Sequence, residues 1–146
     1  MQHIVVGVDG SRASRRALAW AVDQARATRA TVQVVHAWEV PSLGADPLAQ
    51  TLGDPPTLEA QARRELRLVV DEADERGLVS PLECSLVRGE PVQALLDAAK
   101  DADVLVLGSQ GLGAGDAPLG SVSYRLIGRA VCPVVVVPPE DRAGTP

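Results

Sequence analysis

The stretch that decides the fold of this 146-residue chain reads Ile4-Val5-Val6-Gly7-Val8-Asp9-Gly10-Ser11. Its first half is an almost continuous apolar run, which is typical of a strand covered on both faces in a parallel sheet. Its second half is polar and contains a glycine, as expected of a turn that leads into a helix. We therefore predict a βα unit, with Val8, Asp9, Gly10 and Ser11 at the carboxyl end of its strand.

Four further apolar runs follow along the chain, and helical patterns alternate with them. The runs predict strands over residues 31–35, 82–87, 104–107 and 134–137. Apolar residues at three- and four-residue spacing predict helices over residues 13–25, 58–73, 91–99 and 121–131. The order βαβαβαβαβ is the signature of an α/β fold in which a five-stranded parallel sheet is doubly wound by right-handed crossovers.

Residues 40–56 interrupt this alternation, because they contain four prolines and two glycines. We interpret them as a long loop between the second strand and the second helix, a length that is usually functional or disordered. Residues 1–138 are predicted to form one domain. Residues 139–146 are polar, contain Gly and Pro, and are predicted to form a flexible tail.

The composition excludes several classes of protein. A formal net charge of −5 argues against nucleic acid and anionic membranes as partners. The sequence shows neither a membrane-spanning apolar run nor a signal peptide, so we expect a soluble, cytoplasmic protein. Cys84 and Cys132 are too few for a disulfide framework, and we predict two buried thiols in a reducing compartment.

The strongest sign of a ligand follows the fourth predicted strand. Two groups of residues flank the loop there: Gly108, Gln110 and Gly111, and then Gly120, Ser121, Val122 and Ser123. Glycines let a backbone approach a ligand and adopt positive φ, and a helix that starts at Ser121 offers unpaired N–H groups to an anion. The loop is not a Walker A motif, because the Lys is missing. Phosphate binding is favoured over the alternative, a flexible loop before a capped helix.

The second sign is the polar turn after the first strand. The carboxylate of Asp9 could accept hydrogen bonds from ribose hydroxyls or reach a Mg²⁺ ion bound to a ligand. Helix capping by Asp9 or Ser11 is the alternative, and by position alone it is slightly favoured. The two signs support each other, because ligands of open α/β sheets bind at the carboxyl ends of the strands.

Other reactive side chains form no recognisable site. His36 at the end of the second strand is interpreted as a packed or hydrogen-bonded side chain rather than a catalyst. No cluster has the spacing of a metal site, and no Gly-x-Ser-x-Gly nucleophile motif is present. Asp101 and Asp103 flank a strand start, at the end of the sheet opposite the predicted site, and are interpreted as solvated.

Taken together, these pieces resemble the universal stress protein family over nearly the whole chain. The resemblance is carried by the stretch from Ile4 to Ser11, Val35-His36-Ala37, Gly89-Glu90-Pro91, the strand at 104–107 with its glycine loop, and Cys132-Pro133 with the four valines that follow. It implies a Rossmann-like fold of the adenine-nucleotide α-hydrolase type, with strand order 3-2-1-4-5. In that order, the crevice lies between Asp9 and Gly108.

The resemblance also implies a function. Gly108, Gln110 and Gly111 would line the ribose and phosphates, and Gly120 to Ser123 would hold the phosphates. Asp9 would face the ribose or Mg²⁺, and the backbone at Ala37 would face the adenine edge. Only eight residues separate Gly111 from Gly120, one fewer than in the family's ATP-binding branch, and they include Asp116.

We expect a regulatory protein that senses or transduces occupancy by ATP, or by ADP or AMP, with Mg²⁺ carried by the phosphates. Slow ATP hydrolysis is the most activity expected of it. The family resemblance implies a homodimer through the edge strand Val134 to Val137. The alternative is a dimeric interaction protein of the same fold that does not bind nucleotide.

Overall fold

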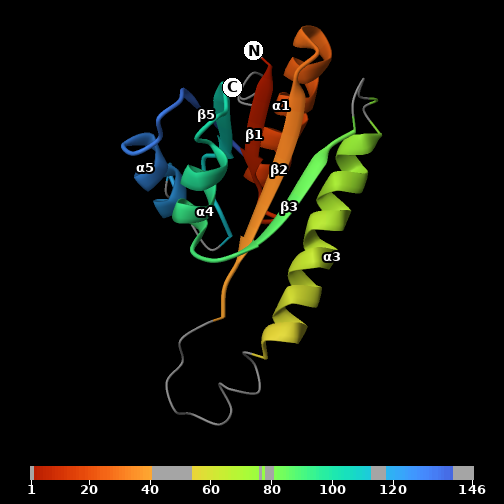
Figure 1. Cartoon of the computed structure of the whole chain (residues 1–146), viewed down its shortest axis with the longest axis vertical. Helices are drawn as coiled ribbons and strands as arrows, with labels where there is room; N and C mark the ends of the chain where they lie inside the picture. Colours follow the sequence, from red (N-terminus) through yellow and green to blue (C-terminus); the bar gives the residue numbers. More distant parts are fainter. Residues whose placement is uncertain (1, 41–53, 76, 78–80, 113–117, 140–146) are drawn as a thin grey trace, which may run out of the picture.

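The computed structural model describes residues 2–40, 54–75, 77, 81–112 and 118–139. Strands and helices alternate in the order β1 (His3–Gly7), α1 (Arg12–Thr28), β2 (Thr31–Trp38), α3 (Pro55–Asp74), β3 (Glu83–Arg88), α4 (Pro91–Ala98), β4 (Val104–Gly108), α5 (Ser121–Ile127) and β5 (Val134–Val137). The five strands form one parallel sheet in the order β3-β2-β1-β4-β5 (Figure 1). The predicted fold class and strand order are therefore confirmed.

Helices cover both faces of the sheet, as the uninterrupted apolar strands require. Successive residues of a strand point to opposite faces, so Val6 packs with residues of α1 and α3 such as Leu18 and Leu66. Its neighbour Val5 packs on the other face with residues of α4 and α5 such as Leu95 and Leu126. Aliphatic side chains and alanine thus supply both cores.

Side-chain caps fix the starts of α1 and α3. Ser11 caps α1 by accepting a hydrogen bond from the Ser14 N–H at 3.2 Å. Asp54 caps α3, and Pro55 and Pro56 form its first turn. Assigning these two prolines to the loop was therefore wrong. Proline suits the first helical turn, because the N–H that it lacks would have no partner there.

One smaller expectation is corrected, and another is confirmed with an added contact. Cys84 is exposed on the edge strand β3 and Cys132 is only partly buried, so the two thiols are not both core side chains. Asp103 is exposed, as expected, and its Oδ2 also accepts hydrogen bonds from the N–H groups of Gln2 and His3. These hydrogen bonds lower the pKa of the Asp103 carboxyl and fix the amino terminus beside β4.

The topology creates the position for a site. β1 and β4 are neighbours at the centre of the sheet, but their connections leave in opposite directions along it. The loops that follow them therefore diverge and open a crevice at the carboxyl end of the sheet. Within the described residues, no helix is long and apolar enough to cross a membrane.

Candidate functional site

A pocket of about 380 Å³ opens at the carboxyl ends of β1, β2 and β4. Its lining includes every site residue proposed from the sequence except Gly10: Val8, Asp9, Ser11, Ala37, Gly108, Gln110, Gly111, Gly120, Ser121, Val122 and Ser123. Gly10 lies in the same turn with φ of 84°, in the left-handed region that glycine adopts without strain. The two sequence signs thus lie together on one cavity.

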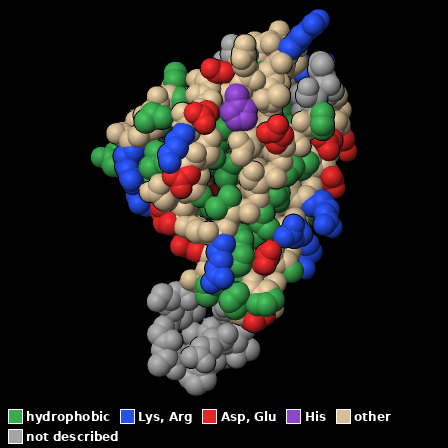
Figure 2. Space-filling model, viewed as in Figure 1, with side chains coloured by type: hydrophobic (Ala, Val, Ile, Leu, Met, Phe, Trp, Pro, Cys, Tyr) green, Lys and Arg blue, Asp and Glu red, His purple; other side chains and the backbone are tan. Residues whose placement is uncertain are grey.

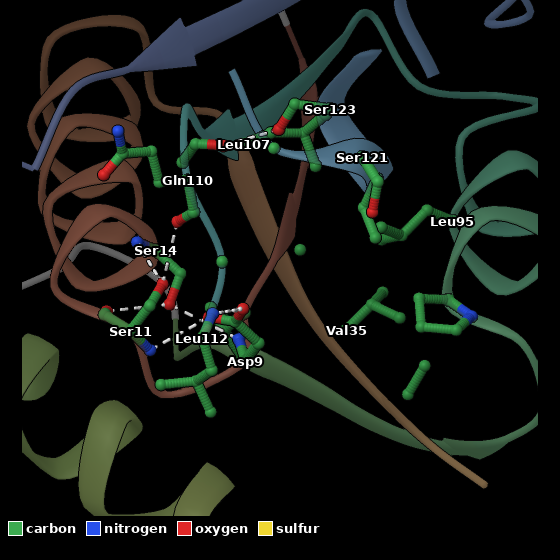
Figure 3. Close-up of a pocket in the computed structure, with 18 of the residues that line it drawn as sticks. Asp9, Ser11, Ser14, Val35, Leu95, Leu107, Gln110, Leu112, Ser121 and Ser123 are labelled. Carbon is green, nitrogen blue, oxygen red and sulfur yellow. Dashed lines mark hydrogen bonds between the residues drawn. The ribbon is translucent and has the colours of Figure 1, made fainter. Parts of the chain in front are cut away.

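Asp9 joins the two loops on the polar side of this pocket. Its Oδ1 accepts a hydrogen bond from the Ser11 N–H at 2.9 Å, and its Oδ2 accepts one from the Leu112 N–H at 3.1 Å (Figure 3). The first bond closes an Asx turn before α1, and the second reaches the loop after β4. The Asp9 carboxylate is therefore held in place between the two loops.

Two serines strengthen the same junction. Ser11 caps α1 and also donates from Oγ to the Gln110 carbonyl at 3.3 Å. Ser14 is 3% exposed, donates from Oγ to the Ser11 carbonyl at 3.0 Å, and lines the pocket. Sequence reasoning missed Ser14, although its place three residues after the cap on the buried face of α1 could have indicated it. The capping role of Ser11 and its place in the site both hold.

The site glycines allow segments of the protein to approach one another. A Cβ on Gly108 would lie 2.6 Å from backbone atoms of Ala13 and Ser14, so the end of β4 packs directly on α1. A Cβ on Gly111 would lie 2.6 Å from the Asp9 Oδ2. Close approach to a ligand and positive φ were the reasons predicted for these glycines. At Gly108 the structure instead shows tight helix–strand packing, and only Gly10 among the site glycines has φ in the left-handed region.

The loop after β4 is anchored on both sides of residues 113–117, which include Asp116 and lie outside the described residues. Ser123 donates from Oγ to the Gly108 carbonyl at 2.6 Å, and the Gly120 N–H donates to the Ser109 carbonyl at 2.6 Å. Helix α5 starts at Ser121, as predicted, and its N-cap Gly120 has no side-chain hydrogen bond. The first backbone N–H groups of α5 therefore have no side-chain cap, and the residues that carry them line the pocket.

The other side of the pocket is apolar. Val35, Leu95 and Leu107 are aliphatic residues that line it. Figure 3 shows Val35 and Leu95 across the pocket from Asp9 and Ser11. Val35 and Leu95 belong to the core beneath α4 and α5, and sequence reasoning treated them only as core. Their position in strand and helix gave no sign that part of their surface lines a cavity.

Charge is scarce around the pocket. Among the described residues that line it, Asp9 is the only charged one. Lys100 lies beyond the end of α4 and pairs with Asp97 at 3.6 Å. Within the described residues, no three His, Cys, Asp or Glu side chains are grouped so that they could hold a metal ion.

An ion pair links the helices on either side of the apolar part. Arg125 on α5 contacts Glu90, the cap of α4, at 3.0 Å. Partial burial raises the pKa of the Glu90 carboxyl, but hydrogen bonds from the Gln93 and Val92 N–H groups and the Arg125 charge outweigh it. That pKa therefore lies below its ordinary value, and Glu90 keeps the charge that holds Arg125.

The chain is therefore an α/β protein with a doubly wound parallel sheet and a pocket at the carboxyl ends of its central strands. The model of the universal stress protein family matches residues 1–138, and the chain belongs to this family. It is 38% identical to a universal stress protein of Thermus aquaticus, with 92% of this chain and 96% of that protein covered. It is 30% identical to one from Mycobacterium tuberculosis, of which it spans only 48%.

Solved structures agree with this assignment. A universal stress protein in complex with cAMP is 30% identical, with a TM-score of 0.71 and with 95% of this chain and 98% of that chain covered. A universal stress protein from Archaeoglobus fulgidus in complex with dAMP is 26% identical, with a TM-score of 0.67 and 94% and 98% covered. The family resemblance seen in the sequence is confirmed.

Proposed function

We propose that this protein binds an adenine nucleotide, ATP with Mg²⁺ above all, and acts as a regulatory protein that responds to nucleotide occupancy. The observation that carries the proposal is the pocket itself. Two loops separated by about a hundred residues meet in it, as the contact between Asp9 and Leu112 shows. A cavity with a few convergent polar groups and an apolar wall is the usual form of a small-molecule site.

The similar structures support an adenine nucleotide as the ligand. One relative holds cAMP and another holds dAMP, so both ligands contain an adenine base and a phosphate. The lining of this pocket suits the same two parts. Val35 and Leu95 would contact the base, and the backbone at Ala37 would meet the adenine edge. The glycines and serines at 108–111 and 120–123 would hold ribose and phosphates.

Mg²⁺ fits this site only as a companion of the phosphates. Asp9 is the one carboxylate among the lining residues that the structure describes, and each of its oxygens already accepts a backbone hydrogen bond. A single carboxylate that keeps free lone pairs can support a hydrated Mg²⁺ ion held mainly by phosphates. The ion would add charge neutralisation that the lining residues lack.

Calorimetry of the full chain with ATP and Mg²⁺ at neutral pH tests the proposal. We expect saturable binding, with GTP weaker than ATP because backbone groups on β2 would read the adenine edge. Nucleotide released by denaturing freshly purified protein, identified by chromatography, provides an independent readout. Absence of ATP binding at millimolar ligand would favour the alternative, an interaction protein of the same fold.

A further inference from the structure

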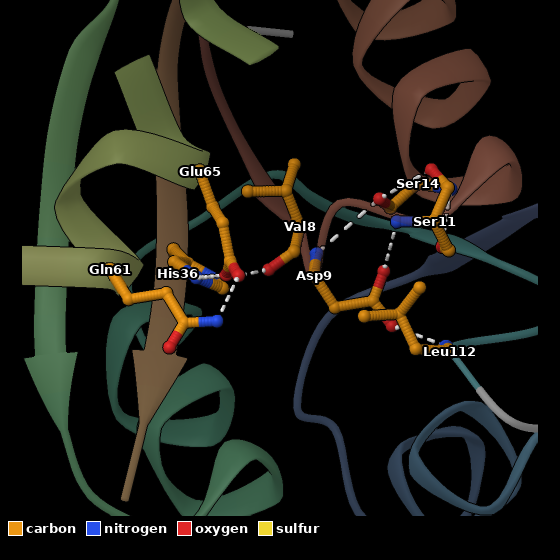
Figure 4. A network of polar contacts seen from close by, with 8 residues as sticks. All are labelled: Val8, Asp9, Ser11, Ser14, His36, Gln61, Glu65 and Leu112. Atoms are coloured by element: carbon orange, nitrogen blue, oxygen red, sulfur yellow. Dashed lines mark hydrogen bonds and ion pairs between the residues drawn. The ribbon is translucent and has the colours of Figure 1, made fainter. Parts of the chain in front are cut away.

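A buried histidine lies behind the pocket and makes two polar contacts. His36 on β2 is 6% exposed and does not line the cavity. Its Nδ1 lies 2.8 Å from the Val8 carbonyl oxygen, and its Nε2 lies 3.1 Å from Oε2 of Glu65 on α3 (Figure 4). His36 thus connects the end of β1 to a helix on one face of the sheet.

Both partners of this imidazole are hydrogen-bond acceptors. The Val8 carbonyl can only accept, so Nδ1 must carry a proton and donate it. Nε2 then faces a carboxylate oxygen, and the contact is attractive only if a second proton lies between Nε2 and Oε2. The two contacts therefore form one partly buried unit, and a hydrogen-bonded unit of this kind fixes the groups that it joins.

His36 and its two contacts lie at the carboxyl end of β1, where β1 stops and β2 continues. β1 ends at Gly7, whereas β2 continues to Trp38 alongside β3. Val8 is the first residue beyond β1, and its carbonyl is held by the imidazole. The next residue is Asp9, whose carboxylate holds the N–H groups of Ser11 and Leu112. A continuous path of bonded groups thus runs from Glu65 to the polar side of the pocket.

We propose that His36 and Glu65 are positioning residues that hold the Val8–Asp9 strand end in its ligand-binding geometry and link the pocket to α3. The part of this inference that concerns nucleotide rests on the proposed function. The Glu65 side chain is 40% exposed, so the link ends at the surface of α3. A partner that contacts this part of α3 can therefore respond to occupancy of the pocket.

Substitutions at Glu65 test the link without disturbing the core. Glu65→Ala removes the acceptor for Nε2 and should weaken ATP–Mg²⁺ and AMP binding by about fivefold to tenfold in calorimetry. Glu65→Gln can still bond the imidazole and should stay within about threefold of the unaltered protein. Glu59→Ala is the matched control, because it removes an exposed ion pair with Arg63 on the same helix.

The comparison has clear contrary outcomes. Equal affinities for Glu65→Ala and Glu59→Ala would overturn the proposal. Equal losses of nucleotide affinity in Glu65→Ala and Glu65→Gln would assign the effect to packing of α3. This result would overturn the proposal as well.

His36→Asn provides the second variant. The Asn amide can take the place of Nδ1 and bond Val8, but it cannot reach Glu65. This variant should lose affinity as Glu65→Ala does, and adding Glu65→Ala should cause no further loss. Independent, additive losses would show that the two residues do not act through one another.

Failure of the proposed function can be told apart from failure of this link. If the unaltered protein binds neither ATP nor AMP, the function fails, and hydrogen exchange of the Ser11 N–H still decides the link. Exchange at Ser11 should be faster in Glu65→Ala than in Glu59→Ala, because the Asp9 turn that accepts this N–H is then held less firmly. Equal exchange rates in the two variants would overturn the link.

Discussion

The carboxylate of Asp9 accepts a hydrogen bond at 3.1 Å from the N–H of Leu112, which lies 103 residues further along the chain. Because Asp9 also holds the Ser11 N–H, one side chain fixes the β1–α1 turn and ties it to the loop after β4. The two loops that form the polar side of the pocket are therefore placed relative to each other before any ligand binds.

Removing this carboxylate should affect both binding and stability. Asp9→Ala leaves the Ser11 and Leu112 N–H groups without their acceptor, and should lower the free energy of unfolding by about 1–3 kcal/mol. Nucleotide affinity should fall at least about tenfold, because the loops lose their common anchor. Denaturant unfolding and calorimetry measure the two effects.

Asp97→Asn serves as the control, because Asp97 contacts only Lys100 among the ion pairs described and lies on the exposed side of α4. Unchanged nucleotide affinity in Asp9→Ala would contradict the anchoring role of this carboxylate.

The substitution Gly108→Ala tests whether packing against α1, without any ligand, already requires glycine at this position. An added Cβ would lie 2.6 Å from backbone atoms of α1, which cannot move as a flexible side chain could. Gly108→Ala should therefore cost about 2 kcal/mol or more of unfolding free energy, even without ligand. Gly128→Ala is the matched control, since its Cβ would meet no atom within 4 Å and its φ is −82°. Equal melting temperatures for the two variants would contradict this explanation.

The fold could be predicted from the sequence because its central strands are nearly continuous apolar runs. Ile4 to Val8 and Val104 to Leu107 are almost wholly apolar, and each is followed by a turn that contains glycine. Apolar runs of this kind fit buried strands of a sheet and few other structures. The order of the strands came from the family resemblance. The two prolines at 55 and 56 were misplaced because the same residue both breaks a helix interior and starts a helix.

Only part of the site could be predicted from the sequence. Asp9 and the glycines stand out by residue type at strand ends, whereas Val35 and Leu95 are indistinguishable from core residues. Ser14 and the His36–Glu65 contact depend on side chains brought together by packing of α1 and α3. Periodicity places residues on the faces of a helix or strand, but it does not state which of them meet across elements.

Assembly is predicted to use the free edge of β5. The Val134 to Val136 side chains are only partly buried. Tyr124 and Ile127 on α5, and Val131 in the connection from α5 to β5, are exposed, and Figure 2 shows hydrophobic side chains on the surface over α5. An exposed apolar edge strand favours pairing, and a second copy of the chain across a two-fold axis would cover it. We expect light scattering to give the mass of a dimer at micromolar concentration.

Val136→Pro tests this edge without breaking the internal ladder. The N–H groups of Leu105 on β4 and of Ser109 just beyond it donate to the Pro133 and Val137 carbonyls, so alternation turns the Val136 N–H away from β4. Proline there removes a donor only from the free edge and should shift the mass towards the monomer. A monomer in the unaltered protein, or an unchanged dimer in Val136→Pro, would contradict pairing through β5.

Hydrolysis of bound ATP is predicted to be slow. Phosphoryl transfer needs stabilisation of developing charge and an oriented water molecule. The part of the lining that the structure describes includes no Lys or Arg, and Arg125 on the neighbouring helix is already paired with Glu90. Turnover measured by phosphate release should remain below about one per second, the lower end of ordinary enzymes. A faster rate that survives removal of contaminating ATPases, and that Asp9→Ala abolishes, would show instead that the pocket is an active site.

The phosphate chain is predicted to contribute little to affinity. The apolar side of the pocket would hold the base, and the described lining residues offer the phosphates backbone N–H groups, serine hydroxyls and the Gln110 amide, but no Lys or Arg. The loop between Gly111 and Gly120 is also one residue shorter than in the family's ATP-binding branch, which should alter the amides that point inward. ATP, ADP and AMP should then differ in affinity by less than about tenfold, or 1.4 kcal/mol, in calorimetry with Mg²⁺. Repeating the series with EDTA separates the ion's share, because Mg²⁺ neutralises ATP more than AMP. A preference for ATP over AMP well beyond tenfold would show that the shorter loop closes on the triphosphate and that its N–H groups, not the adenosine contacts, dominate binding.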